Sequence, residues 1–316
     1  MKTTLVAGGA GFIGSHLCES LLNQNCKVIC VDNFITSDKK NIDRFIGNPN
    51  FIFIKEDITK HLQLKDNIDY VFHLASPASP NIKSPRSYMS FPLETLMANS
   101  EGTHRLLELS RIKNSKFLFA STSEVYGDPL ESPQKENYFG NVNPNGVRSV
   151  YDESKRFGEA ITMAYFRKFD LDTRIVRIFN TFGPFMQADD GRVVSNFIIQ
   201  AISGKPLTVY GNGTQTRSFC YVDDMVEGLK LAMFSDNSKG EVINLGNSNE
   251  KTVLELAKLI KKLANSSSQI IFENLPQDDP KVRQPDVSKA KKILGWETKV
   301  DLEKGLLKTI EYFKSL

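Results

Sequence analysis

The sequence is poor in the residues from which metal sites and disulfide frameworks are built. It has four cysteines and four histidines in 316 residues. The cysteines show no paired spacing with the histidines that is typical of a tetrahedral metal site. We therefore expect no metal and four reduced, mostly buried thiols: Cys18, Cys26, Cys30 and Cys220.

Long apolar runs and a strong excess of one charge are also missing. The formal net charge is +3, which argues against a nucleic-acid partner but suits a small anionic ligand. No stretch approaches the length of a membrane span, and Met1-Lys2 leads directly into an apolar strand without a signal-peptide pattern. The sequence predicts a cytoplasmic protein with no membrane partner.

Short β-branched runs alternate with longer segments of helical period through the first half of the chain. This alternation predicts a Rossmann-type, doubly wound parallel sheet with helices on both faces. The predicted strands are Thr3–Ala7, Lys27–Val31, Phe51–Lys55, Tyr70–Leu74, Lys116–Ser121 and Arg174–Ile178, and the helices between them include Ile13–Leu22, Glu94–Ile112 and Glu153–Phe169.

The regular alternation of strands and helices stops after residue 178. A loop is predicted over residues 180–191, which are rich in Gly, Pro and Asn. We predict a dinucleotide-binding domain over residues 1–178 and a smaller α/β domain, mainly for substrate, over residues 179–316. The chain is expected to return to the first domain around residues 215–245.

A glycine-rich run, Gly8 to Gly14, follows the first strand and opens the first helix. Unpaired amides at the positive end of a helix can bind a pyrophosphate there. Gly8 permits the tight turn, Gly11 lets the backbone approach the phosphates, and Gly14 allows close packing of helix on strand. Without its strand and helix, such a run would only be a turn.

Asp32 ends the second strand, where a carboxylate can accept hydrogen bonds from ribose hydroxyls. Its negative charge favours NAD over NADP, although Lys39 and Lys40 nearby keep NADP open. Asp57 can flank the adenine or can simply close a turn. The full set expected around the dinucleotide is Gly8, Gly11, Phe12, Ile13, Gly14, Asp32, Asn33, Asp57, Ile58, Leu74, Ala75, Asn99, Tyr151 and Lys155.

Tyr151 and Lys155 lie one turn apart at the start of a predicted helix, so both side chains share one face. The Lys155 ammonium is expected to lower the pKa of the phenol and make a base available near neutral pH. The spacing alone is a weak signal. Its position downstream of a glycine-rich turn and of a strand that ends in hydroxyl residues, Ser121 to Ser123, strengthens it.

With these motifs the chain resembles the extended short-chain dehydrogenase/reductase family over nearly its whole length. Within that family it is most similar to the UDP-glucuronate decarboxylases. The segments that carry the resemblance are Gly8–Gly14, Asn99 in Asn-Ser-Glu-Gly-Thr, Ser121–Gly127, Tyr151-Asp-Glu-Ser-Lys155, Ser76–Pro80, Arg177–Pro184, Asp190–Phe197, Leu207–Gly211 and Gln215–Phe219.

The resemblance implies a bound NAD, a UDP-sugar substrate and a redox-neutral decarboxylation of UDP-glucuronate to UDP-xylose through a 4-keto sugar. It implies Thr122, Tyr151 and Lys155 as the hydride-transfer residues, and Arg283 with Ser123 and Glu124 near the sugar carboxylate. Family members commonly form homodimers, which the helices 94–112 and 153–169 would allow. The residues expected to contact substrate are Tyr88, Asn180, Arg192, Val194, Val209, Tyr210, Arg217 and Arg283.

Position 123 separates this reading from neighbouring activities. A 4,6-dehydratase needs an acid there to protonate a leaving hydroxyl, and the serine is a poor proton donor. A 4-epimerase has no evident task for Glu124. A pentose synthase of the UDP-apiose/xylose type, and a non-catalytic dinucleotide-sensing regulator on the same fold, are further alternatives. The regulator would be free to lose Tyr151 and Lys155, and both are present.

One departure from the family pattern lies between Pro80 and Tyr88, where the chain is several residues longer than the usual loop. Lys83 and Arg86 lie in the extra length. Because this loop borders the sugar, its length puts the placement of Tyr88 and the identity of the sugar acid in question.

Overall fold

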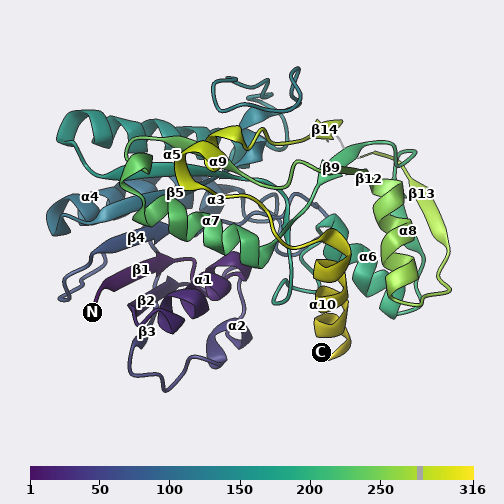
Figure 1. The fold of residues 1–316 in the computed structure, drawn as a ribbon, viewed down its shortest axis with the longest axis horizontal. Helices are drawn as coiled ribbons and strands as arrows, with labels where there is room; N and C mark the ends of the chain where they lie inside the picture. The colour runs from purple at the N-terminus through teal and green to yellow at the C-terminus, as the bar shows by residue number, and fades with distance from the viewer. Residues whose placement is uncertain (276–279) are drawn as a thin grey trace.

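The computed structural model describes residues 1–275 and 280–316, and a seven-stranded sheet forms its centre (Figure 1). All its strand pairs are parallel, in the order β11-β6-β5-β4-β1-β2-β3. The predicted doubly wound α/β class is confirmed. The strands are β1 Thr3–Ala7, β2 Lys27–Asp32, β3 Phe51–Lys55, β4 Tyr70–His73, β5 Lys116–Thr122, β6 Thr173–Ile178 and β11 Val242–Leu245.

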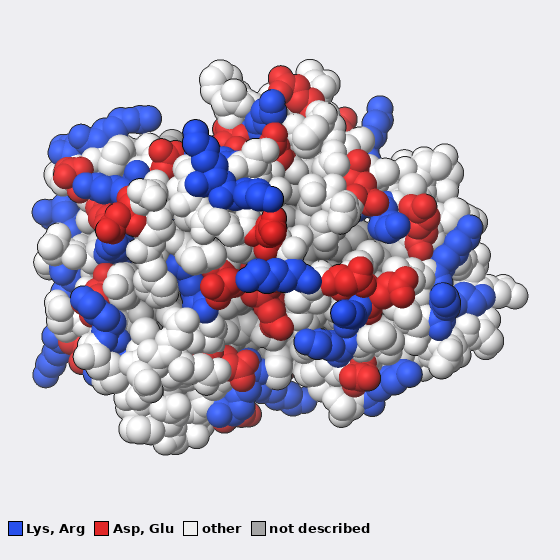
Figure 2. Space-filling view, viewed as in Figure 1, with Lys and Arg blue, Asp and Glu red and all other residues white. Residues whose placement is uncertain are grey.

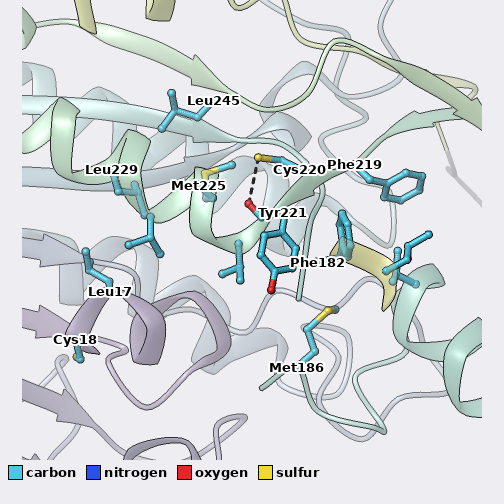
Figure 3. Close-up of a cluster of buried hydrophobic side chains, with 14 of the residues drawn as sticks. Leu17, Cys18, Phe182, Met186, Phe219, Cys220, Tyr221, Met225, Leu229 and Leu245 are labelled. Atoms are coloured by element: carbon cyan, nitrogen blue, oxygen red, sulfur yellow. Dashed lines mark hydrogen bonds between the residues drawn. The ribbon is translucent and has the colours of Figure 1, made fainter. Parts of the chain in front are cut away.

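Helices cover both faces of this sheet because each strand is apolar on both sides. In β1, Leu5 belongs to one buried cluster and Val6 to another, as the two-residue period of a strand requires. Helices α1 (Phe12–Asn23) and α7 (Val222–Phe234) complete the cluster of Val6, and Figure 3 shows their Leu17, Met225 and Leu229 side chains together. Helices α4 (Thr103–Lys113) and α5 (Ser149–Phe169) complete the cluster of Leu5.

The helix predicted over residues 94–112 is divided by one π-helical turn. Helix α3 (Pro92–Met97) leads into the π-turn η1 (Ala98–Gly102) and then into α4. Asn99 donates to the Thr95 carbonyl and accepts at its own carbonyl from the Thr103 hydroxyl. These side-chain bonds compete with the regular helical ladder, and such turns are frequent at functional sites.

Several of the remaining elements form a smaller part of the molecule at the carboxyl edge of the sheet. Strand β8 (Leu207–Tyr210) pairs with β13 (Ile270–Glu273), and β9 (Thr216–Ser218) lies between β12 (Glu250–Thr252) and β14 (Val282–Arg283). The other elements are α2 Lys40–Asp43, η2 Ser123–Tyr126, β7 Thr181–Phe182, α6 Val193–Ile202, β10 Cys220–Tyr221, η3 Asp236–Ser238, α8 Val253–Leu263, α9 Ser288–Leu294 and α10 Leu302–Lys314.

The surface shows no large region of one charge on the face seen in Figure 2, where Lys and Arg side chains are interspersed with Asp and Glu. Within residues 1–275 and 280–316, no helix has both the length and the apolar character needed to cross a bilayer. The four cysteines are all buried and unpaired.

Candidate active site

A cavity of about 970 Å³ opens where the carboxyl ends of β1, β4, β5 and β6 face the smaller part of the molecule. Ligands of open parallel sheets bind at this edge. Its walls come from the glycine-rich turn, the end of β5, the start of α5 and several segments beyond residue 178. The predicted residues that line it are Gly8, Gly11, Phe12, Ile13, Gly14, Leu74, Thr122, Ser123, Glu124, Tyr151, Lys155, Asn180, Arg192, Val194, Tyr210, Arg217 and Arg283.

The glycine-rich turn has the shape that a dinucleotide requires. A Cβ at Gly8 would lie 2.6 Å from the Ala75 nitrogen, and a Cβ at Gly14 would lie 2.1 Å from the Gly8 oxygen. A Cβ at Gly11 would meet only the Gly8 oxygen, at 3.2 Å, so this residue has an open side. Gly11 is also the N-cap of α1 and offers no side chain to its free amides. These residues fit a pyrophosphate on the N-terminus of α1.

Asp32 lies at the end of β2, just behind the cavity wall. Its carboxylate accepts hydrogen bonds from the Ala10 amide (3.0 Å), the Phe34 amide (2.9 Å) and the Ser37 hydroxyl (2.7 Å). Burial raises the pKa of this carboxyl, and the three donors oppose that shift. The Asp32 side chain therefore fixes the loop around Ser37, which does line the cavity.

Several residues that were predicted to touch the dinucleotide lie behind the cavity wall. Their contacts hold the wall residues in place. The Asp57 carboxylate accepts a hydrogen bond from the Asn33 side chain at 3.1 Å. Ile58 packs against Gly102 so closely that a Cβ at Gly102 would lie 2.6 Å from the Ile58 Cδ1 atom. Asn99 is fully buried and donates to the hydroxyls of Ser76 (2.9 Å) and Ser154 (3.1 Å). The members of the predicted set outside the wall are Asp32, Asn33, Asp57, Ile58, Ala75 and Asn99.

Tyr151, Thr122 and Lys155 meet in the cavity, as the sequence predicts. The Tyr151 phenol is hydrogen-bonded to Thr122, whose hydroxyl also accepts from the Glu124 amide at 3.2 Å. The Lys155 Nζ donates to the Ala120 carbonyl at 2.8 Å and lies 5.8 Å from the centre of the Tyr151 ring. One end of β5 and the first turns of α5 therefore hold all three groups.

The electrostatics of this group differ from the expectation in one respect. Burial raises the pKa of Tyr151, the Thr122 hydrogen bond lowers it, and Glu124 raises it further. Burial also lowers the pKa of Lys155 to about 7, against an opposing effect of Glu159. The expected lowering of the phenol pKa by Lys155 is thus absent, because desolvation dominates both groups in this structure.

Glu124 lies between two buried arginines that line the same cavity. Arg148 donates to its Oε2 atom, and the Arg283 Nη2 lies 3.8 Å from that atom. Burial raises the pKa of Glu124, but the attraction of Arg148 and Arg283 outweighs it and brings the value to about 2. Arg283 also donates from Nη1 to the Ser123 carbonyl at 2.5 Å, whereas its buried Nη2 has no hydrogen-bond partner in the part of the chain that the structure describes. This cluster can bind an anionic group beside Tyr151.

The expected substrate residues divide into two groups. Asn180, Arg192, Val194, Tyr210, Arg217 and Arg283 line the cavity. The Arg192 guanidinium is held by both oxygens of the Asp190 carboxylate, at 2.6 and 2.7 Å.

Val209 and Tyr88 lie outside the cavity wall. Alternate residues of β8 face opposite ways, so Thr208 lines the cavity while Val209 points away from it and is completely buried. Tyr88 is also completely buried, with its ring stacked on that of Tyr151.

The structure adds residues that the sequence reading missed. Arg148 lies one helical turn before Tyr151, so a search for basic residues on the same helix face would have found it. Asp152, next to Tyr151, is 6% exposed, and its Oδ1 has no hydrogen-bond partner in the described part of the chain. Residues 1–275 and 280–316 contain no group of three or more acidic, His or Cys side chains that could hold a metal.

Comparisons with known proteins give the class of this protein. The model of the "NAD dependent epimerase/dehydratase family" matches residues 4–246. The chain therefore belongs to the NAD-dependent epimerase/dehydratase family, the extended short-chain dehydrogenases, and NAD is its cofactor.

Among its relatives are UDP-glucuronic acid decarboxylase 1 of Xenopus tropicalis and UDP-glucuronic acid decarboxylase 3 of Arabidopsis thaliana. The first is 49% identical over 99% of this chain and 72% of its own length, and the second is 51% identical over 96% and 86%.

Solved structures agree with the fold. The UDP-glucuronic acid 4-epimerase of Bacillus cereus, in complex with UDP-glucuronic acid and NAD, is 32% identical over 99% of both chains with a TM-score of 0.87. The UDP-glucose 4-epimerase of Thermotoga maritima, with UDP-glucose, is 31% identical over 99% of both chains with a TM-score of 0.88.

Proposed function

We propose that this chain is an NAD-dependent decarboxylase that converts UDP-glucuronate to UDP-xylose and carbon dioxide. The observation that carries the proposal is the buried Nη2 of Arg283, which has no hydrogen-bond partner among residues 1–275 and 280–316 and lies beside Glu124 in the cavity that contains Tyr151. Such a donor calls for an anionic acceptor, and the sugar carboxylate supplies one. The relatives at about half identity, all named UDP-glucuronic acid decarboxylases, support the same substrate.

Bound NAD supplies an acceptor for the hydride of the sugar C4 and later returns it. Tyr151 takes the proton of the 4-hydroxyl and gives it back when the hydride returns. The Thr122 hydroxyl, which is hydrogen-bonded to the phenol, stabilises negative charge on the Tyr151 oxygen while it acts as the base, and Lys155 lies 5.8 Å from the centre of the Tyr151 ring. The residues of the glycine-rich turn hold the dinucleotide so that it stays in place between the two transfers.

A ketone at C4 makes the loss of the carboxylate possible. The C5 bond to the carboxylate breaks, carbon dioxide leaves, and the bonding electrons pass into the ketone to form an enolate. C5 then takes up one proton, so the overall reaction consumes one proton and leaves NAD unchanged. Arg283 and Arg148 hold the carboxylate, and the Glu124 charge beside it favours departure as a neutral molecule.

The decisive experiment incubates the purified protein with UDP-glucuronate and NAD and follows carbon dioxide and the nucleotide product. We expect carbon dioxide and UDP-pentose in equal amounts. UDP-glucose and dTDP-glucose, which lack the carboxylate, are the controls. A UDP-hexuronate product without carbon dioxide would replace the decarboxylase by a 4-epimerase, and turnover of dTDP-glucose alone would indicate a 4,6-dehydratase.

We also propose that the protein works as a homodimer in the cytoplasm. Large apolar side chains are exposed along α3, α4 and α5: Leu93, Met97, Ile112 and Phe157. Two copies that pack these helices together would bury them in a four-helix contact. Four unpaired cysteines suit a reducing compartment.

A further inference from the structure

The extra length between Pro80 and Tyr88 forms a closed loop over the cavity, which we call the strap (residues 79–87). Its base is closed where Ser79 and Ser87 pair and the Tyr88 amide donates to the Ser79 carbonyl at 3.1 Å. Within it, Asn81, Ile82, Lys83 and Arg86 line the cavity. The strap is therefore part of the binding site although it contains none of the residues of the proposed reaction.

One side of the strap is fastened to the segment that precedes α6. The Ser84 hydroxyl donates to the Asp189 carbonyl at 2.6 Å, and the Asn81 side chain donates to the Gly191 carbonyl at 3.0 Å. The packing is close, because a Cβ at Gly191 would lie 2.8 Å from the Cβ atoms of both Asn81 and Ser84. At the far end Lys83 pairs with Glu273 of β13 at 2.9 Å.

Arg86 connects this arrangement to the cofactor side of the cavity. Its Nε donates to the Asp189 carboxylate at 2.6 Å, while its Nη1 donates to the Thr36 carbonyl at 2.9 Å. Thr36 and Ser37 line the cavity, and the Ser37 hydroxyl is bound to Asp32, the residue expected at the ribose. A single guanidinium thus joins the loop after β2 to the loop before α6 across the cavity.

We propose that Arg86 is a positioning residue that retains bound NAD by holding the strap across the cofactor cleft. A dinucleotide that lies from the glycine-rich turn to the Ser37 loop has the strap beside it, and its exit requires the Arg86 bonds to break. A redox-neutral reaction benefits from such retention, because the cofactor that accepts the hydride must return it. The inference uses the family's cofactor and goes beyond the proposed substrate.

The test measures dissociation of NAD from the substrate-free protein. Wild type and Arg86→Gln are loaded with NAD, passed through gel filtration, and assayed for NAD retained with time. We expect Arg86→Gln to release NAD at least about tenfold faster, since charge-assisted hydrogen bonds are lost. Asp189→Asn, which removes the ion pair but keeps Arg86, should show a smaller acceleration. The matched control is Lys291→Gln, which breaks the exposed ion pair between Lys291 and Glu297 in a part of the sequence distant from the strap.

Equal NAD release from wild type and Arg86→Gln, with unchanged thermal unfolding, would overturn the inference. A rise in the KM for UDP-glucuronate with normal NAD retention would also overturn it and assign the strap to the sugar nucleotide. If Arg86→Gln fails to fold, Asp189→Asn decides the question by the same measurement. The NAD-release measurements do not depend on which sugar nucleotide the enzyme converts.

Discussion

Tyr88 lies flat against Tyr151, with ring centroids 4.9 Å apart and an angle of 2° between the ring planes. Tyr88 is completely buried, burial raises the pKa of its phenol, and its hydroxyl has no hydrogen-bond partner in the described part of the chain. The ring therefore supports the proposed base from behind, and the hydroxyl is a polar group without compensation.

This relationship predicts opposite results for two substitutions of Tyr88. Tyr88→Phe keeps the stacked ring and removes the unpaired hydroxyl, so we expect the free energy of unfolding to rise by about 1 kcal/mol with little change in KM. Tyr88→Ala should lower kcat and stability together, because the Tyr151 ring loses its support and a cavity opens. Denaturant unfolding and steady-state kinetics check both; a KM that rises in Tyr88→Phe alone would instead make the hydroxyl a substrate contact.

Tyr151→Phe removes the only atom proposed to take the proton of the sugar 4-hydroxyl. We expect kcat to fall by about 10²- to 10⁴-fold, the usual contribution of a positioned acid or base. UDP-glucuronate binding, measured by calorimetry, should change little. Turnover close to the wild-type rate would remove Tyr151 from the mechanism.

Glu124→Gln should separate the two chemical steps. The amide keeps the size of the side chain but removes the negative charge that lies between Arg148 and Arg283. We expect carbon dioxide release to slow more than nicotinamide reduction, so reduced cofactor should accumulate in a single turnover. Rapid-mixing absorbance at the nicotinamide band, compared with carbon dioxide capture, measures both. Equal losses in the two steps would argue against a role specific to the carboxylate.

Asp152 predicts a pH dependence of substrate binding. Burial raises the pKa of Asp152 to about 8, Glu124 raises it further, and Arg148 and Arg283 oppose the shift. Below pH 8 the group is neutral; above it, a second negative charge appears beside Glu124 and opposes the sugar carboxylate. We expect kcat/KM for UDP-glucuronate to fall above about pH 8 in the wild type, and this limb to be absent in Asp152→Asn.

The raised pKa of Asp152 also predicts how the stability of the fold changes with pH. A carboxyl whose pKa is raised in the folded state destabilises that state increasingly as pH rises from its unfolded value toward about 8. Asp152→Asn should therefore be more stable than wild type, by an amount that grows between pH 4 and pH 8. The matched control variant is Glu153→Gln, at the neighbouring position, where the side chain is 40% exposed and pairs with Arg156. Thermal unfolding over this pH range makes the comparison, and a constant difference would contradict a neutral Asp152.

Phe157 tests the proposed homodimer. Phe157 is 49% exposed on α5, the helix that packs against α3. A glutamate at this position would bury a charge in the proposed contact, so Phe157→Glu should convert the dimer to a monomer in light scattering. Leu130→Glu, at an apolar residue outside these helices that is 82% exposed, should leave the mass unchanged. A monomeric wild type would contradict the proposal.

The sequence predicts the central sheet well because its strands are short, apolar and separated by amphipathic helices. The bounds of β1 and β3 match the prediction, and those of β4, β5 and β6 differ by a residue at one end. The glycine-rich turn and the group of Thr122, Tyr151 and Lys155 were predictable for the same reason, since local spacing places them. Local spacing gave no sign of the π-turn at Ala98–Gly102, because Asn99 replaces helical bonds through its side chain.

What the sequence could not predict depends on contacts between distant segments. Val209, expected at the substrate, faces away from the cavity because the facing of this short strand is set by its packing, here against Gly213 and α8. The pKa values of Tyr151 and Lys155 depend on how deeply the cavity buries them, which no motif reports. The bonds of Arg86 to Thr36 and Asp189 join segments about 50 and 100 residues away.

The guanidinium that completes the anion pocket comes from β14, which pairs with β9 and not with the central sheet. A fragment that ended after β11 would keep every strand of that sheet and the whole glycine-rich turn, yet it would lack Arg283. If such a fragment folds, it should recognise the dinucleotide without handling sugar acids. Gain or loss of this one late strand is therefore a route by which a common nucleotide-binding core can acquire or give up its reaction.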